Sequence, residues 1–338
     1  MRPFAHARPA RLDDALDLLD ATTADVMAAT DGLTPTGTVP RGAANDLLDL
    51  MKEGLFSPGT LVDLRGVEEL SGITRTEDGD VVIGATTTLA DLAAHEALGE
   101  DGPFRAVSEA AAHVAHPQIR ATGTVAGSLL QRPRCWYFRL EDVSCAKKGG
   151  QGCPALEGQN QLHAIFGNQT CAAVHPATLA TPFSALDAVV EVRSARGRRS
   201  VPISSFFVTP EEDVTRENVL QPAEIVTAII LPAPPPGTVS AHTKQGQRES
   251  YDWAFVDVAA SGRRQGDRLT DLRIALGSVA PVPLRARAAE AMLAERGASP
   301  EGFRAAAEAA LEGATPLARN RFKLPMLRAV IRRTLEKL

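Results

Sequence analysis

The four cysteines of this 338-residue chain all fall within one short stretch: Cys135, Cys145, Cys153 and Cys171. We call residues 132–176 the cysteine segment. It is rich in Gly, Gln, Asn and Lys, and no apolar periodicity persists through it. A long irregular segment inside a compact domain is usually functional or disordered, and a bound metal centre would order it. Four thiols gathered in an otherwise cysteine-free chain therefore predict one shared role.

Three kinds of thiol chemistry compete for these residues. Two disulfides are possible with an even number of cysteines, but disulfides are typical of small secreted domains. Structural zinc usually takes cysteines as close pairs separated by two to four residues, whereas 9, 7 and 17 residues separate the cysteines here. An iron–sulfur cluster also takes four thiolates, although the short ferredoxin spacings are absent. Spacing alone leaves the choice open.

The residues around the cysteines, RPRCWYF, SC, GCPALEG and TCAAVHP, carry a specific resemblance. They resemble the FAD-binding (medium) subunit of the molybdenum hydroxylase, or xanthine dehydrogenase, family. More narrowly, they are similar to the branch with an extra 4Fe–4S loop, as in periplasmic aldehyde oxidoreductases and 4-hydroxybenzoyl-CoA reductases. The resemblance runs from about Leu47 to the C-terminus. It implies that the four cysteines hold a 4Fe-4S cluster.

The same resemblance implies an FAD site built from three motifs. In the family, bare glycine backbone at the start of a helix cradles the FAD pyrophosphate. The matching positions in this chain are Gly42, Ala43, Ala44, Asn45, Asp46, Thr124, Ala126, Gly127, Ser128 and Thr178. Without the resemblance, these stretches would be interpreted as a helix N-cap at Asn45 or Asp46 and a local turn with Thr and Ser side chains.

All three motifs depart from the family pattern. Alanine replaces glycine at 43, 44 and 126, and Asp46 adds a negative charge where a phosphate would lie. Ser128 and Thr178 replace the usual Asn and Asp. Alanine in a left-handed conformation costs about 1–2 kcal/mol, and a lost polar contact costs about 1 kcal/mol. We therefore expect FAD to bind weakly or not at all, with the cluster as the electron exit.

Two further pairs of residues have an ordinary and a functional interpretation. Lys147 and Lys148 lie between cluster cysteines, where their charge would raise the cluster potential or simply form a solvated face. Tyr251 and Trp253 belong to a family-like motif in the C-terminal part of the chain. We expect them to pack in a core, although they could also face a flavin ring.

Composition restricts the class of protein. Lys and Arg number 36 against 41 Asp and Glu, giving a net charge of −5 and no basic footprint for nucleic acid. No run approaches the 18 apolar residues of a membrane span. The N-terminus lacks the apolar core of a signal peptide, which predicts a cytoplasmic protein unless a partner subunit carries it across a membrane.

The resemblance implies an α+β fold. Residues 1–232 would form a PCMH-type FAD-binding domain of two subdomains, with the cysteine-rich loop inserted at about 132–176. The proline-rich stretch 233–237 would be a linker, because consecutive prolines form a stiff spacer. Residues 238–338 would form a C-terminal domain of antiparallel strands followed by three helices.

The implied function is electron transfer inside a heteromeric molybdenum hydroxylase that oxidises aldehydes or N-heterocycles. Its partners would be a large subunit with the molybdenum cofactor and a small subunit with two 2Fe-2S clusters. This chain would pass their electrons to an external acceptor. We find no acid, base or nucleophile set that would make it catalytic alone. The alternative is a non-redox scaffold with a degenerate flavin site and a structural metal loop.

Overall fold

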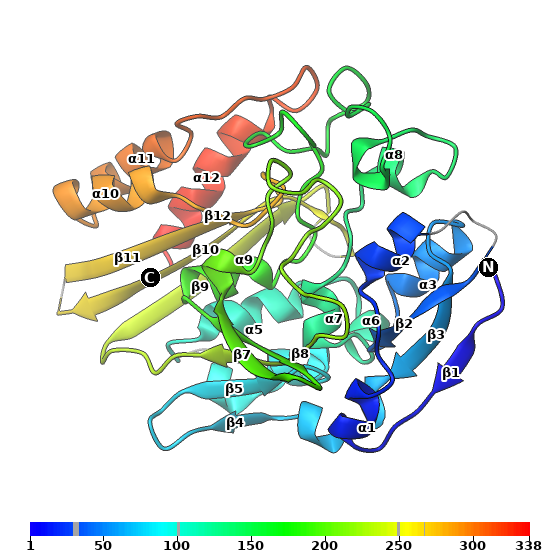
Figure 1. Cartoon of the computed structure of the whole chain (residues 1–338). Coiled ribbons are helices and arrows are strands. Elements are labelled where there is room, and N and C mark those ends of the chain that lie inside the picture. The colour runs from blue at the N-terminus through cyan, green and yellow to red at the C-terminus, as the bar shows by residue number, and fades with distance from the viewer. Residues whose placement is uncertain (30–33, 100–101, 249–250, 267) are drawn as a thin grey trace.

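The computed structural model describes residues 1–29, 34–99, 102–248, 251–266 and 268–338. Within these residues three β-sheets organise the chain, each with its own helices (Figure 1). The architecture is the α+β class that the sequence predicts. No helix in the described part of the chain is long and apolar enough to cross a membrane.

The first sheet is small and parallel, with strand order β1-β3-β2. Leu12, Ala15 and Leu16 are buried on one face of α1, and their spacing is that of an amphipathic helix. The elements of this unit are β1 (Ala5–Ala7), α1 (Leu12–Leu16), α2 (Thr23–Ala29), β2 (Thr36–Arg41), α3 (Leu47–Lys52) and β3 (Pro58–Asp63).

The second sheet is antiparallel, with order β4-β5-β8-β6-β7. Its central strand β8 reads IVTAIIL and is almost wholly buried, as expected for a strand covered on both faces. The strands are β4 (Ile73–Arg75), β5 (Val81–Gly84), β6 (Val189–Ser194), β7 (Gly197–Pro202) and β8 (Ile225–Leu231). Helices of this unit are α4 (Leu89–Ala94), α5 (Arg105–Ala112), α6 (Pro117–Arg120), α7 (Val125–Leu129) and α9 (Ala180–Ala185).

Helix boundaries in this unit follow the residues that begin them. The Thr88 side chain accepts a hydrogen bond from the Asp91 amide at 3.1 Å and caps α4. Helix α5 ends at Ala112, and Pro117 is the first residue of α6, where its missing N–H costs nothing.

The third sheet carries the C-terminal helices (Figure 1). It is antiparallel with order β12-β11-β10-β9. Helix α5 joins it to the second unit, because the Ser240 hydroxyl on β9 accepts from the Ala106 amide at 3.0 Å. The elements are β9 (Thr238–Gly246), β10 (Ala254–Gln265), β11 (Arg268–Gly277), β12 (Leu284–Arg285), α10 (Arg287–Arg296), α11 (Pro300–Ala309) and α12 (Lys323–Leu335).

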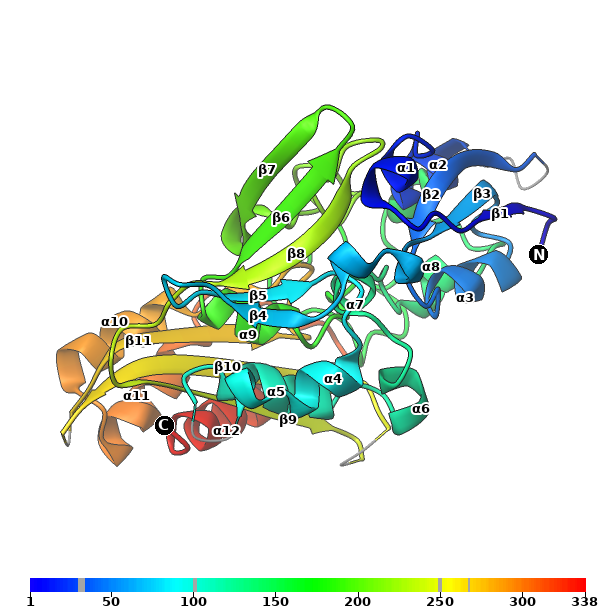
Figure 2. The same cartoon turned by 90° about the horizontal axis from the view of Figure 1, so that it is seen from below.

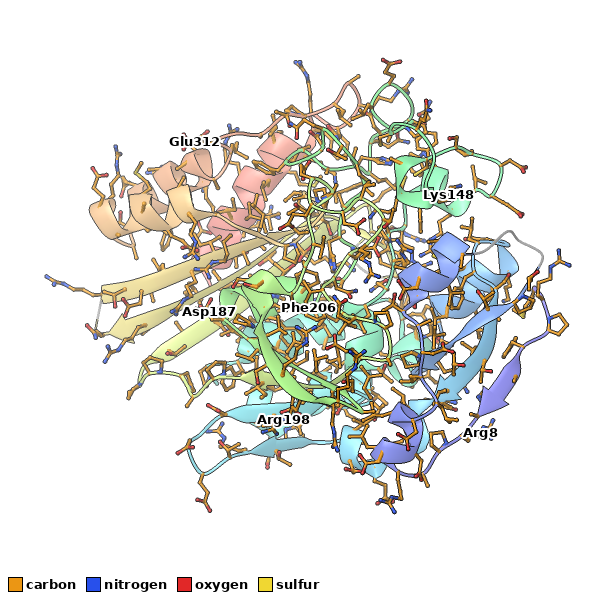
Figure 3. The ribbon with its side chains drawn as sticks, in the orientation of Figure 1. Arg8, Lys148, Asp187, Arg198, Phe206 and Glu312 are labelled. Atoms are coloured by element: carbon orange, nitrogen blue, oxygen red, sulfur yellow. The ribbon has the colours of Figure 1, made fainter. Side chains whose placement is uncertain are left out.

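The cysteine segment runs over the outside of these units and has little regular structure. In Figure 1 it forms the green loops around α8 (Trp136–Arg139), between the blue N-terminal unit and the red helix α12. Figure 2 shows the same arrangement from below. In Figure 3 Lys148 lies on this segment, whereas Phe206 lies near the middle of the molecule, where it is fully buried.

Short 3₁₀ turns complete the described secondary structure. They are η1 (Leu64–Gly66), η2 (Glu68–Leu70), η3 (Glu96–Leu98), η4 (Ala146–Lys148) and η5 (Ile203–Ser205).

Candidate functional site

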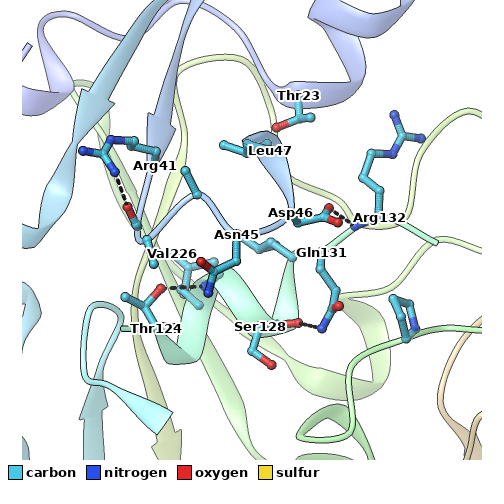
Figure 4. Close-up of a pocket in the computed structure, with 18 of the residues that line it drawn as sticks. Thr23, Arg41, Asn45, Asp46, Leu47, Thr124, Ser128, Gln131, Arg132 and Val226 are labelled. Atoms are coloured by element: carbon cyan, nitrogen blue, oxygen red, sulfur yellow. Dashed lines mark hydrogen bonds between the residues drawn. The ribbon is translucent and has the colours of Figure 1, made fainter. Parts of the chain in front are cut away.

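A cavity of about 420 Å³ lies where the first two units meet the end of the β9–β10 hairpin. All ten positions matched to the FAD motifs line it, although they come from three stretches far apart in sequence. Figure 4 shows Asn45 of the first loop pointing toward Thr124 of the second, with Ser128 below them and Asp46 beside Arg132. The cysteine segment supplies a further part of the wall through Arg132, Arg134 and Pro176.

The first loop leads from β2 into α3. A β-carbon on Gly42 would lie 2.4 Å from the Thr124 hydroxyl, so only glycine allows the first and second loops to approach this closely. Ala44 has φ of 61°, the left-handed region that favours glycine. The structure therefore retains the backbone of a glycine loop at position 44, with an alanine adopting it under strain.

Asp46 does not present a free negative charge to the cavity, which corrects the sequence-based expectation. Its carboxylate accepts from the Arg132 amide at 2.8 Å and from Arg139 Nη2 at 2.7 Å, and Arg134 Nη2 lies 3.2 Å away. The interpretation of Asp46 as a helix N-cap is also wrong in its physical basis, which is a hydrogen bond from the first turn of the helix to the side chain. The residue occupies the N-cap position of α3, but its side chain makes no capping bond.

The second loop forms helix α7 rather than a simple turn. The Thr124 hydroxyl accepts from the Gly127 amide at 3.1 Å and caps this helix. Ser128 follows one turn later. Its hydroxyl is buried on the cavity wall and has no hydrogen-bond partner among the described residues. Buried polar atoms are normally paired, so an unpaired hydroxyl lining a cavity is what a site for a polar ligand would contain.

Aromatic residues from the C-terminal domain form the rim of the cavity. Tyr251 and Trp253 were expected to pack in a core, and this is wrong: they are 59% and 48% exposed and line the cavity. The Arg134 guanidinium lies 5.1 Å from the centre of the Trp253 ring. Because Arg134 directly precedes Cys135, this cation–π contact links the cysteine segment to the cavity rim.

All four cysteines are free thiols with little exposure; Cys145 and Cys171 are buried, and Cys135 and Cys153 are partly buried. Burial raises the pKa of Cys135 to about 11. A hydrogen bond with the Cys171 side chain lowers the pKa of Cys153 to about 6, and the same bond raises the pKa of Cys171. The disulfide interpretation therefore has no support in this structure.

The thiols are near one another without closing on a single point. The charges of Cys145 and Cys153 contribute to the raised pKa of Cys135, and a hydrogen bond between the side chains of Cys153 and Cys171 shifts the pKa values of both thiols. Among the residues that the structure describes, no three His, Cys, Asp or Glu side chains are placed to hold one metal ion. This wider arrangement gives no support to tetrahedral zinc, which requires its ligands around a single ion. Four cysteine thiols match the ligand type of an iron–sulfur cluster, and whether they bind one stays a prediction.

Lys147 does not belong to a solvated face, which corrects one of its two predicted roles. It is buried, and its ammonium lies 2.8 Å from Glu217 Oε1. Arg132 Nε lies 2.9 Å from the other oxygen of Glu217. Burial alone would raise the pKa of Glu217, but these two cations outweigh it and the pKa is lowered. Glu217 also lines the cavity, and it joins the cysteine segment to the flavin-type unit.

The later part of the cysteine segment is attached to the C-terminal domain instead. The Ile165 amide donates to the Val279 carbonyl at 2.8 Å. Asn320 donates to the carbonyl of His163 at 3.1 Å, and the buried ammonium of Lys323 donates to that of Leu162 at 3.4 Å. Burial lowers the pKa of Lys323 to about 7. The first part of the cysteine segment is therefore held by the flavin-type unit, and its later part is held by the C-terminal domain.

Sequence reasoning missed Glu217, His163 and Arg134. His163 Nε2 lies 3.2 Å from the Cys135 sulfur. Burial, with a smaller effect of Lys323, lowers the pKa of His163 to about 4. Arg134 and His163 lie inside the cysteine segment. The sequence signal that could have indicated them is a charged or imidazole side chain in the same segment as the cysteines. Glu217 lies in an irregular stretch 70 positions from Lys147, and nothing local in the sequence indicated it.

Ala44 allows a direct test of the first loop. We expect Ala44→Gly to be more stable than Ala43→Gly by about 1–2 kcal/mol, because both lose one methyl group but only position 44 relieves a left-handed alanine. Denaturant unfolding of the two variants measures this difference. We also expect Ala44→Gly to bind FAD more tightly than the parent chain in a fluorescence titration. Equal stability of the two variants would contradict the strain at Ala44.

Comparison with known proteins gives matches along the whole chain. The family model of the FAD binding domain in molybdopterin dehydrogenase matches residues 2–234, so the likeness includes the first 45 residues. The model of the CO dehydrogenase flavoprotein C-terminal domain matches residues 241–338.

Individual relatives agree with these models. The aldehyde oxidoreductase FAD-binding subunit PaoB of Escherichia coli is 39% identical over 282 residues, covering 82% of this chain and 84% of the relative. The carbon monoxide dehydrogenase medium chain of Hydrogenophaga pseudoflava is 30% identical over 267 residues, covering 79% and 76%. A solved structure of carbon monoxide dehydrogenase from the same organism superposes with a TM-score of 0.72 at 26% identity, covering 100% of this chain and 98% of that one.

Proposed function

Because the chain belongs to the family of FAD-binding subunits of molybdopterin dehydrogenases, we propose that it is the electron-transfer subunit of a molybdenum hydroxylase complex. The observation that carries the proposal is that one cavity is lined by all three FAD motifs and also by the cysteine segment. Arg134 on the cavity wall directly precedes Cys135, so the flavin site and the first cysteine are close in the chain, which suits the passage of electrons between two cofactors.

The residues present fit both cofactors. The close approach of the two loops at Gly42, the left-handed backbone of Ala44, the unpaired hydroxyl of Ser128 and the aromatic rim would hold FAD. The four cysteines would hold a 4Fe-4S cluster. When bound, the cluster would supply one-electron transfer and FAD would supply exchange between one- and two-electron carriers, while the protein sets position and potential.

The protein's own residues prepare these sites. Asp46, with Arg134 and Arg139, fixes the cysteine segment against the first flavin loop and removes the charge that would repel a pyrophosphate. The Arg134–Trp253 contact holds the rim beside Cys135. Since the Asp46 charge is compensated, the expected loss of FAD affinity is limited to strain at Ala44 and the altered polar contacts at Ser128 and Thr178.

The complex would contain a large subunit with the molybdenum cofactor, where the organic substrate is oxidised, and a small subunit with two 2Fe-2S clusters. The likeness to an aldehyde oxidoreductase subunit favours aldehydes as the substrate class over N-heterocycles. The catalytic groups for that oxidation would belong to the large subunit. It would accept electrons from the small subunit and deliver them to an external acceptor.

The cofactor content of the purified chain tests this proposal. We expect anaerobic preparations to contain about four iron and four sulfide per chain, and Cys153→Ala to lose most of this iron. Co-expression with the two partner subunits is expected to give a stable complex that oxidises aldehydes, whereas the chain alone does not. Stoichiometric zinc without sulfide would contradict the cluster. A chain with neither flavin nor iron would support the non-redox scaffold.

A further inference from the structure

His163 stands out because it touches a cluster cysteine and has no role in the proposed function so far. Its Nε2 lies 3.2 Å from the sulfur of Cys135, within the range of a hydrogen bond to sulfur. The residue is only 2% exposed. The Cys135 sulfur thus has an imidazole as its side-chain partner.

The imidazole ring is held in this position from several sides. The Trp136 ring packs edge-on against it with centres 5.1 Å apart, and the Tyr137 ring lies 6.1 Å away. The backbone of His163 is fixed by Asn320, which donates to its carbonyl. The Ala164 amide donates to the Ala172 carbonyl at 2.8 Å and ties this stretch to the residue after Cys171. The contact with Cys135 is therefore imposed by the surroundings of the ring.

The surroundings also assign the proton on the ring. His163 Nδ1 is buried and has no hydrogen-bond partner among the described residues. A buried N–H group that finds no hydrogen-bond acceptor is rarer than a buried acceptor atom that receives no hydrogen bond. In a neutral imidazole only one nitrogen carries hydrogen, so this asymmetry favours the tautomer with hydrogen on Nε2. That N–H then points at the Cys135 sulfur.

We propose that His163 donates its Nε2–H to the Cys135 sulfur and thereby raises the reduction potential of the cluster. The inference rests on the proposed 4Fe-4S cluster. Reduction adds one electron to the cluster and increases negative charge on its sulfurs, and a hydrogen bond to a ligand sulfur stabilises that charge. Hydrogen bonds to the sulfurs are among the factors that set iron–sulfur potentials. The proton stays on His163 throughout, so the residue acts as a tuning and positioning group.

The test is an EPR-monitored redox titration of the full chain with its cluster. His163→Phe keeps an aromatic ring between Trp136 and Tyr137 but removes the donor. We expect the one-electron reduction equilibrium to become about tenfold less favourable, which is a fall of about 59 mV in midpoint potential. His163→Gln keeps an amide donor and is expected to recover most of this fall. Tyr137→Phe removes only a hydroxyl that accepts from the Gln159 amide, and it should leave the potential unchanged.

A second measurement uses the unmodified chain. We expect pulsed EPR of the reduced protein labelled with ¹⁵N-histidine to show a nitrogen coupling to the cluster, and we expect His163→Gln to abolish it. An unchanged midpoint in an iron-replete His163→Phe variant, or no ¹⁵N coupling in the parent chain, would overturn the role of His163. Absence of iron and sulfide from the parent chain would instead overturn the proposed function, so the two failures are distinguishable.

Discussion

Replacement of Glu217 by glutamine is expected to lower the free energy of unfolding by about 3–5 kcal/mol, the usual cost of removing one partner from a buried ion pair. Glu217 is the shared partner of Arg132 and Lys147, and these side chains are 10%, 3% and 5% exposed. A neutral amide would leave two buried cations without a counter-charge. Since both cations belong to the cysteine segment, the variant should also hold less iron.

Denaturant unfolding and iron content measure these two effects. Glu301→Gln is the matched control, because Glu301 pairs with Arg304 at the surface, where both side chains are more than half exposed. That variant should change stability by less than about 1 kcal/mol. Equal losses in the free energy of unfolding of the two variants would show that the buried Glu217 carboxylate contributes no more stability than an exposed one.

The same carboxylate predicts a pH dependence. The pKa of Glu217 is lowered in the folded chain relative to its ordinary value. The folded state therefore binds the proton more weakly than the unfolded state, and the stabilisation is present above the ordinary glutamate pKa. It is lost as the pH falls through the lower pKa of the folded state, and this acid-induced loss should be absent from Glu217→Gln.

The second large effect is expected from Gly42→Ala, which should weaken FAD binding by about 10- to 100-fold. The added β-carbon would lie 2.4 Å from the Thr124 hydroxyl and 3.1 Å from its methyl group. Thr124 is buried and caps α7, so it cannot turn aside without disturbing the second loop. Overpacking of this kind costs about 1–3 kcal/mol, which corresponds to the stated loss of affinity if FAD needs both loops.

Flavin fluorescence during titration with FAD measures the change. Gly66→Ala is the control, since its β-carbon would meet only the Pro9 carbonyl at 3.5 Å, an ordinary contact distance. It should bind FAD as the parent chain does. We expect the iron content of Gly42→Ala to be unchanged, because no cysteine lies at this contact. An unaltered FAD affinity would show that the two loops do not hold the flavin together.

Local patterns in the sequence predicted much of the fold. The α+β class and the C-terminal antiparallel strands followed by three helices are confirmed. The matches to family models confirm the family resemblance. The ten predicted FAD positions lie around one cavity, and whether they bind FAD stays a prediction.

The features that the sequence did not predict depend on contacts between residues far apart in sequence. Asp46 meets Arg139 across 93 positions, so its charge was judged without the cation that compensates it. Lys147 has the composition of a surface residue, and only the fold brings Glu217 to it across 70 positions. Tyr251 and Trp253 resemble core residues in sequence, yet the tertiary structure places them on a cavity rim. No local pattern encodes such pairings.

The division of the cysteine segment between two domains has a consequence for how the protein is made. Arg132 emerges early from the ribosome and can dock on Asp46, which has already been synthesised. Asn320, which fixes the stretch before Cys171, follows His163 by 157 positions. The four thiols therefore cannot reach their final arrangement until almost the whole chain has been translated. Loading of the proposed cluster would then be a late event in biogenesis, and an incomplete nascent chain would present unprotected thiols to any oxidant in its compartment.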